Sequence, residues 1–533
     1  MAACLAAISV LRAEGLLRRI VEPVSAVTNS SGRVVYDFGR ESFGWAEARG
    51  RGEAEIRMGE LLGDDGGVEM NPGGTIRAAS AKLVLDGNFR RVPLTPDKRN
   101  TTGGAEGAAI RLPEKFGTVM PIRFVETPIG AEVRLVAVEW PMDRTASAFS
   151  CDDPALERVY GFCKHSIIAT SFAGMYVDGD RERIPYESDA YINQLGEYAV
   201  HAGPSLARKS HEYLMDHPTW PTEWRQHSIK MAWADWMRTG ETNSLVRCYE
   251  RLKSEKLLLG HVREDGIVLS GGERRRNGKP NSRGLADIVD WPPCERDGFV
   301  FCDANAVVNA FHHSNLMEMA DIAAAIGRTD DALDFRARAE RLRSSFNRVF
   351  FDPSRGVYVD GEGTDHASLH ANAAALAFGL VPPSAIDGVA DFCISRGMAC
   401  SPYFAQYLLE GLFNAGRADA AIDLMTASGD RGWLGMMDFG ATVAMEAWSL
   451  DVKPNLDMNH AWSTAPLNII SRRLLGVEPM EPGFAKIRVA PMPGRLRRVE
   501  GKVPTPRGPV YVKIDGGRIE VDSPVPATVE FGR

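Results

Sequence analysis

Cysteine and histidine are sparse in this 533-residue sequence, and neither occurs at metal-binding spacing. The eight cysteines include no CxxC pair, which argues against a zinc site and against a dense disulfide framework. His312 and His313 are adjacent, and no HExxH pattern occurs. Gly271 and Gly272 do not form a phosphate-binding loop. We therefore expect no metal and no other cofactor.

Long hydrophobic runs are also missing, because no stretch approaches the roughly 18 apolar residues that a membrane span requires. Residues 1–20 begin with a short apolar run, but no basic region precedes it, and Arg12 and Glu14 interrupt it. We interpret this start as an amphipathic helix or an artificial start rather than a signal peptide. The compartment, cytoplasmic or periplasmic, stays open.

The sequence has no excess of positive charge. Its formal net charge of −8 gives no general attraction for nucleic acid or anionic membranes. The one basic run, Glu273–Pro280, contains no aromatic residue and predicts a solvated loop. A sugar is a more natural partner than a nucleic acid or a membrane, and a homo-oligomer is compatible with the sequence.

With 44% hydrophobic and 25% charged residues, the composition is that of a folded protein, and the length predicts two to four domains. From about residue 30 to 145, short β-like segments lie between turn residues, a pattern typical of a sandwich. The predicted strands are Arg33–Tyr36, Ala54–Met58, Lys82–Leu85 and Glu132–Ala137.

From Asp152 to about Leu475, apolar residues recur at helical spacing in about a dozen segments. One predicted helix spans Ala304–Ile326 and stops at Gly327. The next has Thr329 as its N-cap. Its predicted buried residues are Leu333, Ala337, Leu342, Phe346 and Val349. Periodicity alone predicts helix pairs, which can close into a double-layered barrel, but it does not show closure.

After Gly476 the pattern is β-like again and predicts a small terminal sheet. Its strands are Ile487–Val489, Val499–Val503 and Val510–Ile514.

The segment Tyr176–Gln194 crowds five carboxylates into one short stretch that opens a helix. Pro185 and Gly179 prevent a continuous helix, so we expect these charges to project from a loop, where catalytic groups are common. A surface turn with salt bridges is the alternative. The five carboxylates are Asp178, Asp180, Glu182, Glu187 and Asp189.

A second segment, Trp433–Trp462, combines indole rings suited to stacking on sugars with several acidic residues. We expect Glu446 to lie in an otherwise apolar helix between Met445 and Ala447. A carboxylate in that setting is either paired with an arginine as a buried ion pair or functional through a raised pKa.

These two segments resemble the α-L-rhamnosidases of glycoside hydrolase family 78, six-hairpin α-barrel enzymes. The first family motif is an Asp, then Arg-Asp-Glu, then a Trp and an Asp, and its Glu is the general acid. This sequence follows that order once two residues are deleted between Asp178 and Glu182. The matching residues are then Asp178, Glu182, Arg183, Tyr186 and Asp189. The resemblance implies that Glu182 is the acid. Tyr186 replaces the Trp, and the gap leaves Asp180 and Glu187 as rival acids.

The second family motif is Gly-Ala-Thr, then Glu and Trp, with Asn-His downstream. It is met by Gly440, Ala441, Thr442, Glu446, Trp448, Asn459 and His460. Glu446 then resembles the general base, and His460 a contact to a sugar hydroxyl. Two further stretches resemble the family. The sequence VVYDFGRESFGWAEARGRG is similar to its opening β-sandwich, and GVEPMEPGFAKIRVAPMPG is similar to its terminal sheet.

The resemblance implies a multidomain fold in which an all-α (α/α)6 six-hairpin barrel is flanked by an N-terminal β-sandwich and a small C-terminal β-sheet domain. The corresponding domains are residues 1–148, 149–475 and 476–533. The implied activity is removal of terminal α-L-rhamnose from oligosaccharides or glycosides by an inverting acid/base mechanism. The carboxyl groups of such an enzyme lie roughly 6.5 to 9.5 Å apart, against about 5 to 5.5 Å in a retaining one.

We expect Asp178 and Asp189 to bind ring hydroxyls. The other candidate substrate-binding residues, several of them in predicted barrel loops, are Arg183, Tyr186, Trp224, Asp290, Trp291, His370, Trp433, Trp448 and His460. For each tryptophan, a place in the core is the alternative. Two other functions remain open: a six-hairpin glycosidase for another sugar such as an uronate, and a non-catalytic carbohydrate-binding relative.

Overall fold

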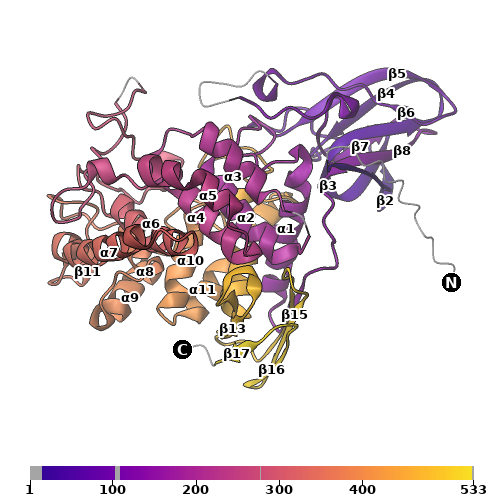
Figure 1. Ribbon diagram of the computed structural model, residues 1–533. Coiled ribbons are helices and arrows are strands. Elements are labelled where there is room, and N and C mark those ends of the chain that lie inside the picture. The colour runs from indigo at the N-terminus through magenta and orange to yellow at the C-terminus, as the bar shows by residue number, and fades with distance from the viewer. Residues whose placement is uncertain (1–14, 102–107, 204, 276–277, 531–533) are drawn as a thin grey trace. The chain divides into compact units, whose positions relative to one another are not determined.

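The computed structural model describes residues 15–101, 108–203, 205–275 and 278–530. The described chain forms a helical domain, an N-terminal sheet domain and small C-terminal sheets (Figure 1). By its internal contacts it divides into two compact units. The first takes in the described residues up to Met142 together with Lys164–Pro185 and Gly435–Ala461, and the second takes in the rest.

The first unit is built on an eight-stranded antiparallel sheet with the order β1-β8-β3-β7-β4-β5, in which β2 and β6 also pair with β3. All four sandwich strands predicted from the sequence are confirmed at least in part. Its strands are β1 (Leu17–Val21), β2 (Ser25–Thr28), β3 (Val34–Arg49), β4 (Arg51–Gly59), β5 (Ala78–Asp86), β6 (Arg90–Arg91), β7 (Met120–Thr127) and β8 (Glu132–Glu139).

Strands of this sheet contribute to several hydrophobic clusters, of which two are large. One contains Ile56 and Met58 of β4 with Ile122 and Val125 of β7. The other packs Trp45 of β3 against residues near the short helix η3 (Ser171–Ala173) and in the segment around Val443. The second cluster anchors two segments that are distant in sequence on the same sheet.

The second unit contains the helices. Six of them form a ring of contacts, because α2 packs on α4, α4 on α6, α6 on α8, α8 on α10, α10 on α13, and α13 on α2. These six are α2 (Glu187–Val200), α4 (Thr222–Thr239), α6 (Ala306–Ala325), α8 (Leu369–Ala377), α10 (Ala405–Asn414) and α13 (Ala465–Ile469). The others are α1 (Pro154–Thr170, shared with the first unit), α3 (Ala207–Asp216), α5 (Asn243–Arg251), α7 (Thr329–Phe350), α9 (Ile386–Arg396), α11 (Ala418–Met425) and α12 (Trp433–Asp438, likewise shared).

Helices α6 and α7 form the predicted hairpin around Gly327. The predicted cap was wrong by one position, since Thr329 is the first helical residue and Arg328 precedes it. The predicted stripe was partly wrong: Leu342 and Phe346 are buried, but Leu333 is 64% exposed and Ala337 is exposed. The buried apolar positions are instead Ala332, Phe335, Ala339, Leu342, Phe346 and Phe350, which keep the spacing of three and four that one helix face requires.

The C-terminal segment forms two small sheets rather than the single one predicted, although its three predicted strands are confirmed (Figure 1). Strand β9 (Ala148–Cys151), which precedes the helices, pairs with β14 in one of them. The remaining strands are β12 (Val477–Pro479), β13 (Ile487–Val489), β14 (Arg498–Val503), β15 (Val510–Asp515), β16 (Arg518–Asp522) and β17 (Ala527–Val529), with a separate hairpin of β10 (Phe351–Asp352) and β11 (Val357–Tyr358).

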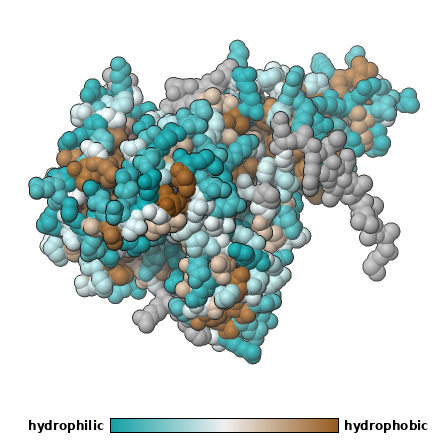
Figure 2. Space-filling view, in the orientation of Figure 1, coloured by the Kyte–Doolittle hydropathy of each residue, from teal (hydrophilic) through white to brown (hydrophobic). Residues whose placement is uncertain are grey.

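The start of the chain differs from the amphipathic helix predicted over residues 1–20. Residues 1–14 lie outside the described residues, and Leu17–Val21 pairs with β8 as a strand. Among the described helices, none has the length and apolar character needed to cross a membrane. On the face shown in Figure 2, hydrophilic side chains predominate over the helices, and hydrophobic ones form small separate areas.

Candidate functional site

The first acidic segment is an irregular loop between η3 and α2. The backbone N–H of Asp178 donates to the Ile184 carbonyl at 3.0 Å, and the Ile184 N–H donates to Asp178 Oδ1 at 2.9 Å, so the loop is closed at its base. The predicted loop is confirmed for Asp178, Asp180 and Glu182. It was wrong for Glu187 and Asp189, which stand in the first turn of α2, where the helix dipole favours acidic residues.

The helix predicted around Glu446 is not formed, because this part of the segment pairs with the later residues of the same segment instead. Helix α12 ends at Asp438, and Gly440 follows with φ +107°. The Glu446 N–H donates to the Asp457 carbonyl at 2.9 Å, and the His460 N–H donates to the Ala444 carbonyl at 2.6 Å. An apolar local sequence is thus held in an irregular conformation by backbone bonds to residues 11 and 16 positions away.

One guanidinium contacts both candidate catalytic carboxylates. Arg181 Nη1 donates to Glu446 Oε2 at 2.6 Å, and Nη2 donates to Glu446 Oε1 at 2.9 Å. Its Nε donates to Glu182 Oε1 at 3.1 Å. Nη1 also donates to the Asn455 carbonyl at 3.0 Å. Arg181 therefore fixes Glu446 in a planar, bidentate pair and brings Glu182 to the same place.

The surroundings of Glu446 keep its carboxyl group ionised. Lys453 Nζ and the backbone N–H of Asp457 each donate to Oε2 at 3.0 Å. Burial would raise the pKa of Glu446, which is 2% exposed, but the charges of Arg181, His460 and Lys453 outweigh burial and lower this pKa to about 2. The side chain of Glu182, by contrast, is 32% exposed.

Asp457 has the opposite electrostatic character. Burial raises its pKa to about 7, against the lowering effect of Arg181 and with a further raising effect of Asp180. Its Oδ2 accepts the backbone N–H of Arg181 at 2.7 Å. The second segment therefore holds one carboxylate that is ionised at any ordinary pH and one that titrates near neutrality.

Three further predicted residues belong to the first unit. Arg183 is buried and donates to Asp180 Oδ1 through Nε at 3.1 Å and Nη2 at 2.5 Å. His460 is buried and contributes to the low pKa of Glu446. Trp448 is buried as well. The structure thus brings His460 and Glu446 together, and it engages Arg183 in the scaffold of the acidic loop.

The other predicted residues lie in the second unit, where the aromatic ones cluster. The ring of Trp224 packs edge-on against the rings of Tyr186 and Trp462, with centroid distances of 5.5 Å and 6.2 Å. Tyr403 stacks on Trp462 at 5.6 Å. Trp433 is fully buried, and its Nε1 donates to the Ser463 carbonyl at 2.6 Å. These rings have the environment of a core, as the alternative interpretation of the tryptophans expects.

Asp290 is a buried acceptor for several groups of the second unit. It accepts His370 Nε2, the Ser401 N–H and the Trp291 N–H, each at 2.8 Å. Ser401 and His370 both bond to the aspartate and not to each other, so they do not form a nucleophile–base pair. His370 was predicted in a loop but lies in the first turn of α8, and Trp224 likewise lies in α4. Trp291 is partly exposed, and Asp189 accepts the Ser188 hydroxyl at 2.9 Å.

Several site residues were missed by sequence reasoning. Lys453, Asp457 and Arg181 contact or neighbour Glu446, and the only local signal was the crowding of charges in both segments. Glu223 of α4 was also missed: it accepts the N–H groups of Ile288 at 2.9 Å and Val289 at 3.0 Å. Val289 has φ +62°, a strained value for a β-branched residue, so Glu223 holds a strained segment just before Asp290.

Within the described ranges, no three His, Cys, Asp or Glu side chains are grouped so that they could hold a metal ion.

Two family descriptions match the chain. The bacterial α-L-rhamnosidase six-hairpin glycosidase domain matches residues 144–474, and the bacterial α-L-rhamnosidase C-terminal domain matches residues 476–531. An α-L-rhamnosidase of Alteromonas sp. (strain LOR) is 26% identical over 336 residues, which cover 58% of this chain and 34% of the relative. One of Formosa agariphila is 20% identical over 566 aligned positions, covering 96% and 56%. The chain thus spans about a third to just over half of these relatives.

Solved structures share the fold. An α-L-rhamnosidase from Dictyoglumus thermophilum has a TM-score of 0.76 and 18% identity, with 96% of this chain and 58% of that chain covered. The Streptomyces avermitilis α-L-rhamnosidase, complexed with L-rhamnose, has a TM-score of 0.73 and 16% identity, with 93% and 48% covered. Because the six-hairpin match takes in more than half of the sequence, the chain belongs to the family of bacterial α-L-rhamnosidase six-hairpin glycosidase domains.

Proposed function

We propose that the protein is a glycoside hydrolase that removes terminal α-L-rhamnose from oligosaccharides or glycosides. In the proposed reaction, Glu182 gives its proton to the departing glycosidic oxygen while water attacks the anomeric carbon. Glu446 takes a proton from that water, so the sugar leaves with the water hydroxyl and an inverted anomeric centre. Family membership and the contact that both acidic side chains make with Arg181 support the proposal.

The observation that carries the proposal is the shared contact with Arg181. The nitrogens of a guanidinium lie about 2.3 Å apart, so the bonded oxygens of Glu182 and Glu446 are at most about 8 Å from each other. This limit admits the carboxyl separations of glycosidases. The carboxylates of two residues that are 264 positions apart in the sequence therefore lie close enough together to act on one sugar.

The environments of the two groups differ in charge and in exposure. Glu446 is held ionised by its cationic neighbours, as a group that must accept a proton has to be. Glu182 has the more exposed side chain of the two, as a group that must reach a bulky leaving group needs. A pKa of about 2 makes Glu446 a weak base, so in this proposal the incoming substrate and water loosen its pair with Arg181.

We also propose the finer architecture. The ring of six contacting helices is the inner layer of an (α/α)6 barrel, and the domains extend over residues 1–148, 149–475 and 476–533. Strand β9 refines this division, because it starts the helical segment yet pairs with β14. The proposed substrate sites in the second unit are the partly exposed Trp291 and the neighbouring Asp290.

The test is hydrolysis of 4-nitrophenyl α-L-rhamnoside by the full chain, with nitrophenyl glycosides of other sugars, including an uronate, as comparison. We expect Glu182→Gln and Glu446→Gln each to lower kcat by about 10²-fold or more. Glu241→Gln, at an exposed ion pair, is the matched control and should keep full activity. NMR of the first-formed anomer reports inversion. Near-normal turnover in both site variants would exclude the assignment.

A non-hydrolysing rhamnose-binding protein is the second candidate, and the burial of Glu446 favours it. Both oxygens of this carboxylate are bonded within the protein, as in a structural ion pair. Titration calorimetry with L-rhamnose separates the candidates. Binding of the sugar without hydrolysis of any glycoside in the panel would establish the second and exclude the first.

A further inference from the structure

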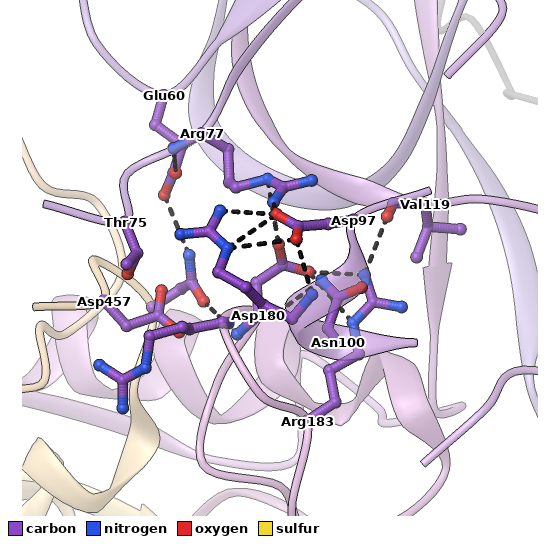
Figure 3. Close-up of polar contacts among 12 residues, drawn as sticks. Glu60, Thr75, Arg77, Asp97, Asn100, Val119, Asp180, Arg183 and Asp457 are labelled. Carbon is purple, nitrogen blue, oxygen red and sulfur yellow. Dashed lines mark hydrogen bonds and ion pairs between the residues drawn. The ribbon is translucent and has the colours of Figure 1, made fainter. Parts of the chain in front are cut away.

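Asp180 stands two residues before Glu182 and is the centre of a buried polar network (Figure 3). Its Oδ1 accepts both Nε and Nη2 of Arg183, and its Oδ2 lies 3.3 Å from Nε of Arg77. Arg77 is in turn paired with Asp97. The carboxylate of Asp180 is therefore held from two sides, by one arginine of its own loop and by one that directly precedes strand β5.

The backbone of Asp180 is held as well. Its carbonyl accepts Asn100 Nδ2 at 2.7 Å, and its N–H donates to Asn459 Oδ1 at 2.8 Å. Asn100 ends the short helix η1 (Lys98–Asn100) of the sheet domain, and its side chain points to Asp180 in Figure 3. The side chain, the N–H and the carbonyl of one residue are thus all engaged, which restrains this point of the loop.

The restraint continues on both sides of Glu182. At Gly179, which has φ +154°, an added Cβ would lie 2.5 Å from Asp457 Oδ2, so the chain runs directly against that aspartate. On the other side, Arg183 adopts φ +55° and donates through Nη2 to the Val119 carbonyl at 2.9 Å, while its own carbonyl accepts the Ile110 N–H at 2.9 Å. Glu182 is therefore a partly exposed side chain carried between two fixed backbone points.

Such a network contributes more to geometry than to stability. Burying several carboxylates and arginines costs desolvation energy that their pairing roughly repays. Proton transfer to a leaving oxygen, by contrast, requires the acid within hydrogen-bond reach, and an error of about 1 Å can cost up to about 10²-fold in rate. A scaffold that fixes the loop on both sides of Glu182 is what such a reaction needs.

We propose that Asn100 and Arg77 of the sheet domain are positioning residues for Glu182, acting through Asp180. This inference rests on the proposed function, in which Glu182 is the proton donor. The sheet domain then takes part in catalysis by holding the loop from which the acid projects.

The experiment compares two rhamnosides that differ in their need for the acid. A 2,4-dinitrophenyl leaving group departs without protonation, whereas an alkyl alkoxide does not. For Asn100→Ala in the full chain, we expect kcat to fall about 10-fold on methyl α-L-rhamnoside and less than about 2-fold on the dinitrophenyl rhamnoside, with KM little changed on both. Arg77→Lys, which keeps the charge but not the geometry, should show the same selectivity.

Asn347→Ala is the matched control. This asparagine of α7 also donates to a backbone carbonyl, that of Leu380 at 3.0 Å, and none of its partners is a candidate site residue. It should leave both substrates unaffected, and thermal unfolding midpoints of all variants identify any general loss of fold. In a Glu182→Gln background, Asn100→Ala should add less than about 2-fold, because the group that it positions is gone.

The results separate this inference from the function on which it rests. If Glu182→Gln slows the alkyl substrate far more than the dinitrophenyl one while Asn100→Ala and Arg77→Lys slow both equally or neither, only the positioning role is overturned. If Glu182→Gln itself shows no such selectivity, Glu182 is not the acid, and both proposals fall.

Discussion

Arg181 binds Glu446 through two parallel hydrogen bonds, at 2.6 and 2.9 Å, across 265 positions of the sequence. A bidentate arginine–carboxylate pair of this kind fixes the orientation of both planar groups and favours the ionised carboxylate. The same arginine reaches Glu182 through Nε. One side chain therefore sets both the charge of one candidate catalytic residue and the place of the other.

Removal of the Arg181 charge is expected to raise the pKa of Glu446. Burial raises this pKa, and Arg181 is the largest of the groups that lower it to about 2. Without that cation, we expect the pKa to rise by about 1 to 3 pH units. The acidic limb of the kcat/KM profile of Arg181→Gln should therefore move to higher pH, as measured with 4-nitrophenyl α-L-rhamnoside between pH 3 and 8.

Arg336→Gln is the control for this shift, because Arg336 forms an exposed pair with Asp321. Its pH profile should match that of the unaltered protein. Arg181→Lys should lie between the two, since lysine keeps the charge but cannot make the bidentate pair. An acidic limb that stays in place in Arg181→Gln would show that Glu446 does not control the profile.

Glu410 is expected to make the protein sensitive to acid. Burial raises its pKa, but Arg472 and Arg473 outweigh burial and lower the pKa from 4.5 to about 2. A carboxylate whose pKa falls on folding stabilises the fold above its unfolded pKa, and this contribution is lost as the pH drops towards 2. The difference corresponds to roughly 3 kcal/mol. Glu410→Gln should lower the urea midpoint at pH 7 and lose much less further stability between pH 5 and 3.

The control for Glu410 is Glu520→Gln, which removes an exposed partner of Arg518 and should leave the midpoint unchanged. Equal acid sensitivity of Glu410→Gln and the unaltered chain would contradict the prediction.

Glu41 has the opposite linkage. Glu41 lies on β3, and its burial is the main cause that raises its pKa well above 4.5, while the negative charge of Glu60 is the second cause. Burial also raises the pKa of Glu60 to about 7. A carboxyl group whose pKa rises on folding stabilises the fold below its unfolded pKa, and that stability is lost as the pH rises through the folded pKa. Glu41→Gln, neutral at every pH, should therefore raise the thermal midpoint at pH 8 relative to the unaltered chain but change it little at pH 5. Glu53→Gln on the exposed side of β4 should do neither.

The sequence was sufficient for seven of the strands and for the hairpin of α6 and α7, because period-two and period-3.6 patterns are local. It did not predict the other strands, and it assigned the residues of β1 to a helix. It was insufficient to predict which face of α7 is buried, because Leu333 and Ala337 also occur at helical spacing but lie on the solvent side. Which of two overlapping stripes is buried depends on the packing of α6, and no local rule decides that.

The candidate site shows the same division. The acidic loop followed from Pro185 and Gly179, which local rules interpret correctly. The helix predicted around Glu446 was wrong, because local apolar residues favour a helix while the backbone bonds of Glu446 to Asp457 and of His460 to Ala444 impose another conformation. Arg181 was overlooked since its partner is far away in the sequence, and only a three-dimensional structure pairs them.

Two of the predicted sugar-binding tryptophans differ in how deeply they are buried. Trp433 is fully buried with its Nε1 bonded to Ser463, so Trp433→Ala should destabilise the protein by about 3 to 5 kcal/mol. Trp291 is partly exposed, so Trp291→Ala should cost far less stability but raise KM for the nitrophenyl rhamnoside several-fold, if its ring meets the sugar. Urea unfolding and steady-state kinetics on both variants test the contrast. An unchanged KM for Trp291→Ala together with a large loss of stability would assign this ring to the core as well, and the sugar would then have to be bound by other residues.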